Sequence, residues 1–377
     1  MPLSIFPTDS TTAKYSQLWD TRSEGKVILK MLLMRFYKHL NRLEKKQVKQ
    51  PRPLIDPDRH KAQDCRAGIV GLGLMGTSIT ACLLAAGHQV AGLEKSVSRR
   101  RSIKRHVLTL LKQLSKEGFL ESDPDALIEN LTVSSSYSVL ADAAVVVESI
   151  TENLNSKVEV LFQVESVVSP STLIVTNTSA IPITRIQEKM SFPGRVLGMH
   201  WDEPAHVTVF MEIVRGKQTS RAYLHLAAEI ARKWWGKDPS QVRRDVKGFI
   251  TNRISYAMFR EASYLVDSGI ATIEDVDRSL RNDVGWWIGF VGPFRYMDLM
   301  GVRAYETVMR DLLPDLSCGK QVPRIMRQAT KEGGNGISNG RGFYTYTPVQ
   351  AKSWEKRFLA YNYEMRRLTA KYSIPDE

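Results

Sequence analysis

Between Ala67 and Thr176 short apolar runs, rich in β-branched residues, alternate with segments of helical periodicity. Apolar runs of four or five residues are typical of strands buried on both faces, and their alternation with helices is typical of βαβ units. The pattern predicts strands over 67–71, 89–93, 131–134, 144–147 and 172–176, and helices over 77–86, 99–116 and 157–168. This order predicts an α/β fold with a Rossmann-type, doubly wound parallel sheet.

Beyond about residue 245 the strand pattern gives way to helical periodicity. Thr272 followed by Asp275 is a capping pattern for a helix over 273–280. The Gly292-Pro293 pair is expected to break the next helix. Further apolar stripes of helical spacing predict helices near 254–265, 305–313 and 353–372. We therefore expect three regions, an N-terminal extension over 1–66, an α/β domain over 67–245 and an all-α C-terminal domain over 246–377.

Residues 1–66 carry much of the positive charge. They hold 14 Lys or Arg and 7 Asp or Glu, which is +7 of the formal net charge of +13. An apolar stripe from Ile28 to Leu43 predicts an amphipathic helix there. Three interpretations stay open: a helix packed on the main body or on a partner subunit, a poorly ordered tail or misassigned start, or a targeting or membrane-surface segment. The remaining chain has only a modest excess of positive charge, so we expect no nucleic-acid partner.

Cysteine content and hydropathy exclude several classes of protein. Only three cysteines are present, too few for a disulfide framework or a Cys-rich metal site, so we expect no metal and a reducing, cytoplasmic location. Organellar targeting by the N-terminal extension is left open. No run approaches the ~18 apolar residues of a transmembrane segment.

A glycine-rich loop between the first predicted strand and helix predicts dinucleotide binding. Glu94 ends the second predicted strand, where a carboxylate accepts hydrogen bonds from ribose hydroxyls and repels a 2′-phosphate. The cofactor is therefore predicted to be NAD, although the basic segment from Arg99 to Arg105 argues for NADP unless it is a solvated helix face. The loop consists of Gly71, Leu72, Gly73, Leu74, Met75 and Gly76.

Four further motifs follow the loop in order: TNTS at 176–179, GMHWDEP at 198–204, FMEIV at 210–214 and KGFITNRI at 247–254. With them the chain resembles the 3-hydroxyacyl-CoA dehydrogenase family, including its hydroxybutyryl-CoA, lambda-crystallin-like and carnitine dehydrogenase branches. The resemblance covers about residues 67–346. It implies an NAD-dependent oxidoreductase acting on a CH–OH group, as in fatty acid metabolism, with the active site between the two domains, and a homodimer.

The resemblance also assigns roles to single residues. His200 matches the catalytic general base and Glu212 its carboxylate partner. An imidazole suits proton removal from an alcohol near neutral pH. Ser179 matches a serine that contacts substrate and cofactor, and Asn252 an asparagine that holds the reacting oxygen. Structural alternatives are a helix cap for Ser179 and a helix-start residue for Asn252.

Other positions match residues that line the cofactor or depart from the family pattern. Glu152 and Lys157 match cofactor-lining positions. Glu203 stands where the family usually has asparagine, so a carboxylate replaces a neutral amide near the nicotinamide. It is a specificity candidate, expected to make His200 a stronger base and to disfavour anionic substrates, unless it points to solvent. Trp286 and Trp287 are expected to line an apolar pocket, pack in a core or form a subunit interface.

These observations predict an enzyme that interconverts a 3-hydroxyacyl-CoA, or a similar β-hydroxy substrate, and its 3-oxo form. Two alternatives stay open: a dehydrogenase of a non-CoA hydroxy acid or carnitine-like substrate, and a catalytically silent dinucleotide-binding relative. A nucleic-acid-associated protein is the least favoured class. The exact substrate, stereochemistry and pathway do not follow from these residues.

Overall fold

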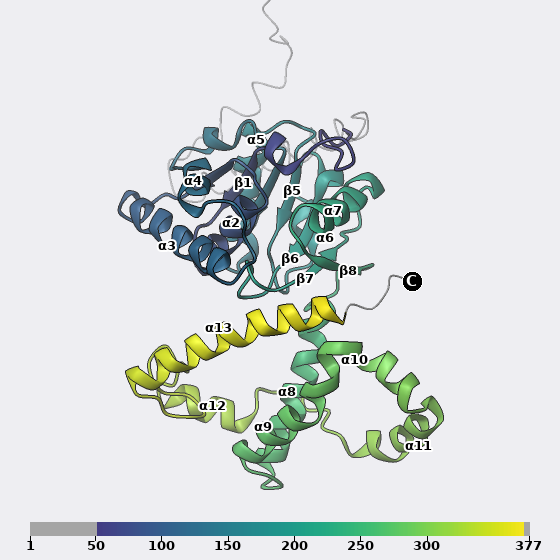
Figure 1. The fold of residues 1–377 in the computed structure, drawn as a ribbon. Helices are drawn as coiled ribbons and strands as arrows, with labels where there is room; N and C mark the ends of the chain where they lie inside the picture. The colour runs from purple at the N-terminus through teal and green to yellow at the C-terminus, as the bar shows by residue number, and fades with distance from the viewer. Residues whose placement is uncertain (1–50, 373–377) are drawn as a thin grey trace, which may run out of the picture. The chain divides into compact units, whose positions relative to one another are not determined.

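A computed structural model describes residues 51–372 (Figure 1). The amphipathic helix expected within the N-terminal extension lies outside the described residues, as do residues 373–377. No helix within 51–372 combines the length and apolar character needed to cross a bilayer.

Eight strands form one sheet in the order β3-β2-β1-β4-β5-β6-β7-β8. β1 to β6 are parallel, β7 is antiparallel to β6, and β8 is parallel to β7. The order of the first six strands is that of a dinucleotide-binding doubly wound sheet, which confirms the predicted fold class. The strands are β1 (Ala67–Val70), β2 (Val90–Leu93), β3 (Leu131–Ser134), β4 (Val145–Glu148), β5 (Leu173–Thr176), β6 (Val196–His200), β7 (Phe210–Val214) and β8 (Asp238–Val242).

The sheet is buried on both faces, and its central strands are mainly apolar. In β4, Val145, Val146 and Val147 are all fully buried. Val145 and Val147 belong to one core cluster and Val146 to another, as the alternation of side chains along a strand requires. The helices of this α/β region are α2 (Leu74–Ala85), α3 (Val97–Lys116), α4 (Pro124–Leu127), α5 (Leu154–Val167), α6 (Ile183–Gln187) and α7 (Arg221–Lys233). Short 3₁₀ turns connect some elements, η2 (Ala62–Asp64), η3 (Ile128–Asn130), η4 (Tyr137–Leu140) and η5 (Pro193–Arg195).

The five predicted strands are confirmed, with ends that differ by at most one residue. The helices predicted at 77–86, 99–116 and 157–168 begin two or three residues earlier than expected, as α2, α3 and α5. Three strands, β6 to β8, and α7 were absent from the prediction. β8 has the sequence DPSQV and little apolar character, so its strand conformation depends on pairing with β7.

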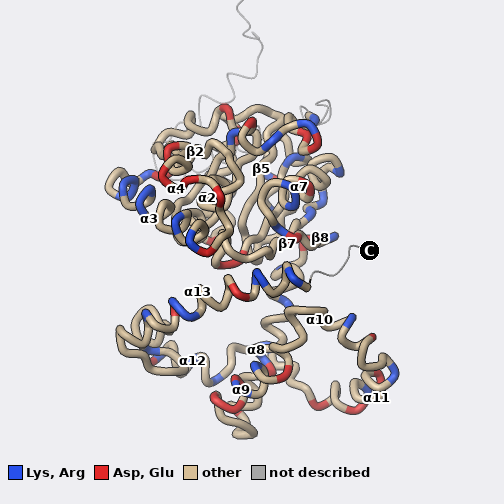
Figure 2. The backbone as a smooth tube through the Cα atoms, in the orientation of Figure 1, with Lys and Arg blue, Asp and Glu red and all other residues tan. Residues whose placement is uncertain are grey.

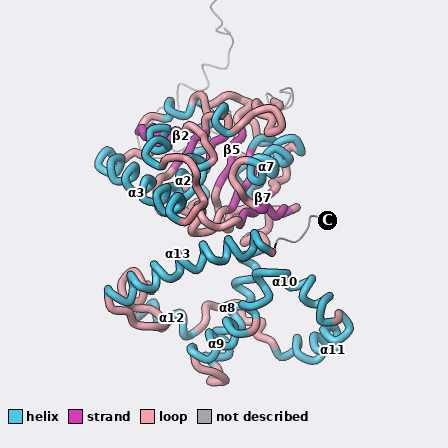
Figure 3. The backbone as a smooth tube through the Cα atoms, viewed as in Figure 1, coloured by secondary structure: helices cyan, strands magenta, loops and turns pink. Residues whose placement is uncertain are grey.

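After β8 the described chain is helical (Figure 3). Gly292 has φ 68° and precedes Pro293, and together they kink α10 as predicted. Thr272 caps α9 by accepting a 3.1 Å hydrogen bond from the amide of Asp275, as predicted. The helices are α8 (Thr251–Asp267), α9 (Ile273–Asn282), α10 (Val284–Met300), α11 (Val302–Leu312), α12 (Arg324–Lys331) and α13 (Pro348–Lys371), with η6 (Leu313–Asp315) after α11.

Candidate active site

The glycine-rich loop has the geometry that a dinucleotide requires. Gly71 has φ 90°, in the left-handed region that favours glycine. A Cβ on Gly76 would lie 1.8 Å from the Gly71 carbonyl oxygen, so only glycine fits where helix and strand meet. A Cβ on Gly73 would meet nothing within 4 Å, which leaves open space beside the N-terminus of α2. That N-terminus has no side-chain cap, so its amides are available to a pyrophosphate.

Glu94 is held in place at the end of β2. Its Oε1 accepts the Ser96 amide at 2.9 Å, and its Oε2 lies 3.2 Å from the Arg99 guanidinium. Arg99 also donates to the Leu72 carbonyl oxygen at 3.1 Å, which ties Glu94 to the glycine-rich loop. The basic residues along α3 are visible in Figure 2. The Arg99 ion pair leaves this arginine less available for a 2′-phosphate, which favours NAD.

His200 and Glu212 form a close, buried pair. They are directly opposed in the antiparallel pairing of β6 and β7, so their side chains share one face of the sheet. His200 Nδ1 lies 2.9 Å from Glu212 Oε2. Phe210 and Phe249 contact the imidazole edge to face, with ring centroids 5.6 and 5.8 Å away, which limits its rotation. The arrangement brings together the two residues that the resemblance assigned to proton transfer.

The other oxygen of Glu212 joins the sheet to α8. Glu212 Oε1 accepts the amides of Ile250 and Thr251 at 3.0 and 2.8 Å. The turn that aims these amides includes Phe249 with φ 49°, an unusual conformation for a bulky residue. Burial alone would raise the pKa of Glu212, but the hydrogen bonds from His200 and from the two amides together lower it below its usual value. Glu212 is therefore an anion at neutral pH, and it favours the Nδ1–H tautomer of His200.

Ser179 and Asn252 meet beside this pair. Asn252, at the start of α8, donates its side-chain amide to the Ser179 carbonyl oxygen at 3.0 Å. Glu152 fixes the same turn, since its Oε1 accepts the amides of Ser179 and Ala180 and, at 2.5 Å, the Thr178 hydroxyl. Glu152 therefore orients the serine. This role went unrecognised in the sequence, where Glu152 carried only a cofactor-lining assignment.

Lys157 is enclosed by carboxylates. Its ammonium donates to Glu148 Oε1 at 2.8 Å and lies 3.5 Å from Glu152 Oε2, and the side chains of Lys157 and Glu148 are both fully buried. Glu148 also accepts the Thr176 hydroxyl and the Ile150 amide. The predicted contact of Lys157 with the cofactor stays a prediction. Its contacts make Lys157 the centre of an ion-pair network beneath the Glu152 turn.

Glu203 does not point to solvent. Its Oε2 is buried without a hydrogen-bond partner in the described part of the chain. Burial is the main cause that raises the pKa of Glu203 to about 7, and the nearby Asp202 carboxylate adds to it. The carboxyl faces Ser78, whose hydroxyl also lies 2.8 Å from His206 Nδ1. A solvent-exposed Glu203, one of the sequence interpretations, is therefore wrong.

The raised pKa of Glu203 makes stability depend on pH. The folded protein holds the Glu203 proton up to about pH 7, whereas an unfolded chain releases it near the ordinary glutamate value of 4.5. The folded state loses stability relative to the unfolded state as pH rises through this window. Glu203→Gln should therefore raise the melting temperature above pH 7 and have little effect below about pH 4.5. Equal melting temperatures for both proteins at pH 8, roughly one unit above that pKa, would contradict it.

Two expectations concern residues away from this centre. Trp286 is 80% exposed, so packing in a core of its own chain is wrong for it, whereas Trp287 stacks on Tyr296 with centroids 4.1 Å apart. Within residues 51–372 no group of three His, Cys, Asp or Glu side chains is arranged to hold a metal ion.

The fold and this site define a class, the NAD-dependent oxidoreductases that act on a CH–OH group. The family model "3-hydroxyacyl-CoA dehydrogenase, NAD binding domain" matches residues 66–246, and the model of the C-terminal domain of the same family matches residues 248–346. The chain therefore belongs to the 3-hydroxyacyl-CoA dehydrogenase family. This confirms the resemblance seen in the sequence and the NAD cofactor.

Two curated relatives are named for different substrates, one without coenzyme A and one with it. The chain is 31% identical over 289 residues to 5-formyl-3-hydroxy-2-methylpyridine 4-carboxylate 5-dehydrogenase of Mesorhizobium japonicum, covering 76% of this chain and 92% of the relative. It is 30% identical over 280 residues to a probable 3-hydroxybutyryl-CoA dehydrogenase of Bacillus subtilis, covering 74% of this chain and 96% of the relative.

Solved structures of the same two kinds of enzyme also match this chain. A 5-formyl-3-hydroxy-2-methylpyridine 4-carboxylic acid 5-dehydrogenase, described as an NAD+-dependent dismutase, superposes with a TM-score of 0.76 and 28% identity. The aligned region covers 80% of this chain and 97% of the solved chain. The (S)-3-hydroxybutyryl-CoA dehydrogenase of Ralstonia eutropha gives a TM-score of 0.62 and 29% identity, with 75% and 99% coverage.

Proposed function

We propose that this chain oxidises a β-hydroxy substrate, a 3-hydroxyacyl-CoA or a similar compound, to its 3-oxo form, with the His200–Glu212 dyad as general base. The observation that carries the proposal is the 2.9 Å contact between His200 Nδ1 and Glu212 Oε2, beside the hydrogen bond that joins Asn252 to Ser179. NAD, when bound, supplies the acceptor for the hydride that leaves the substrate carbon.

The chain's own residues hold and move the proton. Because Glu212 accepts the hydrogen on Nδ1 of His200, Nε2 is free to take the proton of the substrate hydroxyl. The Glu212 carboxylate then stabilises the imidazolium. The Ser179 hydroxyl and the Asn252 amide are both able to hydrogen-bond the reacting oxygen as hydroxyl and as carbonyl.

A second candidate substrate class lacks coenzyme A. It is supported by the larger TM-score to the pyridine-carboxylate dehydrogenase than to the hydroxybutyryl-CoA enzyme, 0.76 against 0.62. That relative is named for a formyl compound and described as a dismutase. A hydrated formyl group presents a CH–OH unit, so removal of its hydroxyl proton by this dyad, with NAD as the acceptor of the hydride, would yield a carboxylic acid. The second candidate is a small aromatic hydroxy or formyl acid.

The experiment is a substrate panel followed by the absorbance of the reduced cofactor. The panel holds 3-hydroxyacyl-CoA esters, free β-hydroxy acids, carnitine, and aromatic acids with a hydroxymethyl or formyl group, each with NAD and with NADP. We expect reduction of NAD by one class and weaker reduction of NADP, because Glu94 repels a 2′-phosphate. Silence across the panel, with NAD binding confirmed on the same sample, would favour the catalytically silent relative.

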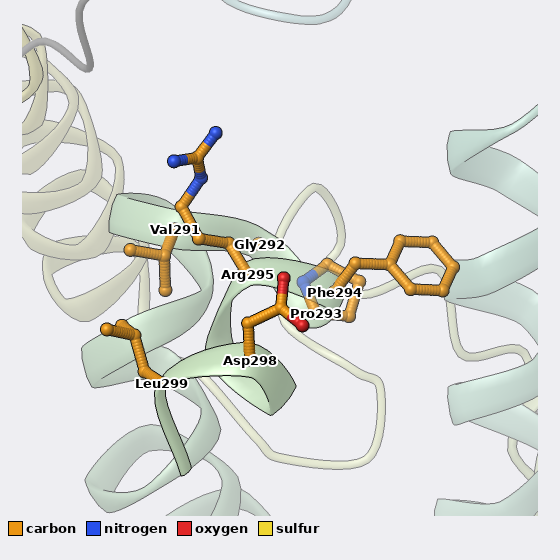
Figure 4. Close-up of a pocket in the computed structure, with 7 residues that line it drawn as sticks. All are labelled: Val291, Gly292, Pro293, Phe294, Arg295, Asp298 and Leu299. Carbon is orange, nitrogen blue, oxygen red and sulfur yellow. The ribbon is translucent and has the colours of Figure 1, made fainter. Parts of the chain in front are cut away.

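We also propose that two copies of the chain form a homodimer through the helical region. No residue of α8 to α12 is buried in the described chain. Trp286 and Phe294 of α10 are 80% and 79% exposed. At the α10 kink a hollow of about 650 Å³ is lined by Val291 to Arg295 with Asp298 and Leu299 (Figure 4).

A second copy is the occupant that this apolar surface favours. Helices with so much apolar surface need a permanent cover, since monomers rarely expose apolar patches beyond a few hundred Å². Extensive and strongly apolar interfaces are typical of obligate homodimers. Transient partners bury smaller and more polar surfaces.

Sedimentation at several protein concentrations tests the dimer. Wild type should sediment as a dimer at micromolar concentration, and replacing Trp286 and Phe294 together by Glu should give monomers or aggregates. Phe162→Glu is the control, because Phe162 is 45% exposed on α5, outside the helical region. A wild-type monomer, or a double variant that stays fully dimeric, would overturn the proposal.

For location we propose a reducing compartment such as the cytoplasm. All three cysteines are free, Cys65 and Cys82 buried and Cys318 exposed, which supports a chain that folds without disulfides.

A further inference from the structure

Glu203 is a partly buried carboxyl that the proposed proton transfer does not use. It lies in the loop between β6 and β7, three residues after His200. The Ala205 amide and the Ser78 hydroxyl face the carboxyl, while its Oε2 is buried and lacks a partner in the described chain. An orphaned oxygen of this kind costs free energy unless a bound group satisfies it.

The contacts of this loop place the carboxyl at the edge of the sheet where the glycine-rich loop lies. Ser78 is on α2, two residues after Gly76. At the start of the Glu203 loop, Asn177 accepts the Trp201 amide at 2.8 Å and donates to the Ser149 hydroxyl at 3.3 Å. Ser149 lies against the glycine-rich loop, 3.9 Å from where a Cβ on Gly76 would be. In doubly wound sheets the dinucleotide binds at this edge, beyond the carboxyl ends of the strands.

The cations around Glu203 are directed elsewhere. The buried Lys237 ammonium donates to the carbonyl oxygens of Ala205, at 2.6 Å, and Thr208, and lies 4.9 Å from the Trp201 ring. Arg366 of α13 donates to the His206 carbonyl oxygen at 3.3 Å. No ion pair to Glu203 is found among the described residues.

The other titratable neighbours supply no cation either. Burial is the main cause that lowers the pKa of His206 to about 4, with Lys237, Arg366 and His106 adding to it, so His206 is neutral at pH 7. Asp202, exposed on the same loop, raises the pKa of Glu203. Among residues 51–372 the Glu203 carboxylate therefore has no countercharge.

We infer that Glu203 discriminates between the oxidised and the reduced forms of the dinucleotide by placing its carboxylate near the nicotinamide. The oxidised nicotinamide ring carries a positive charge and the reduced ring is neutral. The carboxylate therefore stabilises bound NAD+ but not bound NADH, whereas a neutral amide at this position would not distinguish them by charge. This inference rests on the proposed function, since it requires the nicotinamide to lie at this edge of the sheet.

Ionisation of Glu203 is coupled to this preference. Near pH 7 part of the free protein carries a protonated Glu203, because burial raises its pKa to about 7. Binding of NAD+ favours the carboxylate, so the O–H bond breaks and the proton passes to solvent. Binding of NADH leaves the proton in place. Above this pKa the carboxylate is already formed, and the preference for NAD+ reaches its full value.

The test measures dissociation constants of NAD+ and NADH by titration calorimetry, without substrate, for wild type and Glu203→Gln. Measurements at about pH 6 and pH 8, one unit either side of the Glu203 pKa, span its ionisation. In wild type the ratio of the NADH to the NAD+ dissociation constant should rise between the two pH values. The factor by which it rises should be roughly ten times larger in wild type than in Glu203→Gln. Wild type should also release protons on binding NAD+ at neutral pH, detected in two buffers of different ionisation enthalpy.

Asp202→Asn is the matched control. Asp202 is the exposed neighbouring carboxylate, and the variant keeps the Oδ1 that accepts the Glu203 amide at 3.0 Å. It should keep most of the wild-type ratio and its pH dependence. Glu203→Asp, which retains the charge, should keep the direction of the preference and guards against a Glu203→Gln protein that fails to fold.

The outcomes separate the two proposals. If both cofactors bind and Glu203→Gln has the same ratio as wild type at both pH values, the inference about Glu203 is overturned while the proposed function stands. If wild type binds neither cofactor, the proposed function fails. An effect of Asp202→Asn as large as that of Glu203→Gln would indicate general surface charge and would also overturn the inference.

Discussion

His200→Ala is expected to lower turnover by ~10² or more while leaving the affinity for NAD nearly unchanged. The imidazole is the group placed to take the hydroxyl proton, and Glu212 and the rings of Phe210 and Phe249 fix its orientation. Within residues 51–372, the hydrogen bond and ring contacts of His200 involve neither the glycine-rich loop nor Glu94. The measurement pairs steady-state kinetics on the substrate identified by the panel with calorimetric titration of NAD.

Two further variants make the result specific. His225→Ala, at an exposed position on α7, should leave turnover at the wild-type value. Glu212→Gln keeps one side-chain oxygen near His200 but removes the negative charge. It should therefore lower turnover less than His200→Ala and change the pH profile of turnover. Turnover in His200→Ala equal to that of wild type would exclude His200 as the base.

The α/β fold and the glycine-rich loop were predictable because their signals are local. Strands β1, β2, β4 and β5 are short, mainly apolar runs, and Gly71, Gly73 and Gly76 have fixed spacing behind the first of them. The loop needs a left-handed φ at Gly71 and no Cβ at Gly76, and both requirements are properties of single residues. Such requirements are visible in a sequence without any knowledge of distant contacts.

The contacts of the site were not predictable from spacing, because they depend on how strands and turns meet. Twelve residues separate His200 from Glu212, and their contact follows from the antiparallel register of β6 and β7, which no local pattern encodes. The same holds for Glu152, which is 27 residues from the Ser179 amide that it accepts. The family resemblance named His200 and Glu212, and the register of β6 and β7 explains why their side chains lie in contact.

The sequence pattern also did not predict that the apolar faces of the C-terminal helices are exposed. The helical region reads as amphipathic, and amphipathic helices normally bury their apolar stripe within their own chain. Here the stripes of α8 to α12 are at most partly covered in the described chain, and none of their residues is fully buried. The pattern specifies which faces are apolar but not whether the covering surface belongs to the same chain or to a second copy.

Lys157→Met is expected to lower the free energy of unfolding by about 3–5 kcal/mol, the usual cost of breaking a buried ion pair from one side. The variant removes the cation from a carboxylate that is fully buried and leaves Glu148 with only the Ile150 amide and the Thr176 hydroxyl. Melting temperature and urea midpoint measure the loss.

The double variant Lys157→Met/Glu148→Gln is the decisive control. It removes both charges of the pair, so it should recover a large part of the stability that Lys157→Met loses. The two variants also separate the structural role of Lys157 from the cofactor-lining role that the family resemblance assigns to it. If Lys157→Met melts like wild type but binds NAD more weakly, the lysine acts on the cofactor rather than as the anchor of Glu148. If stability falls and the double variant restores it, the loss comes from the unpaired buried Glu148 carboxylate, and the role of Lys157 is structural.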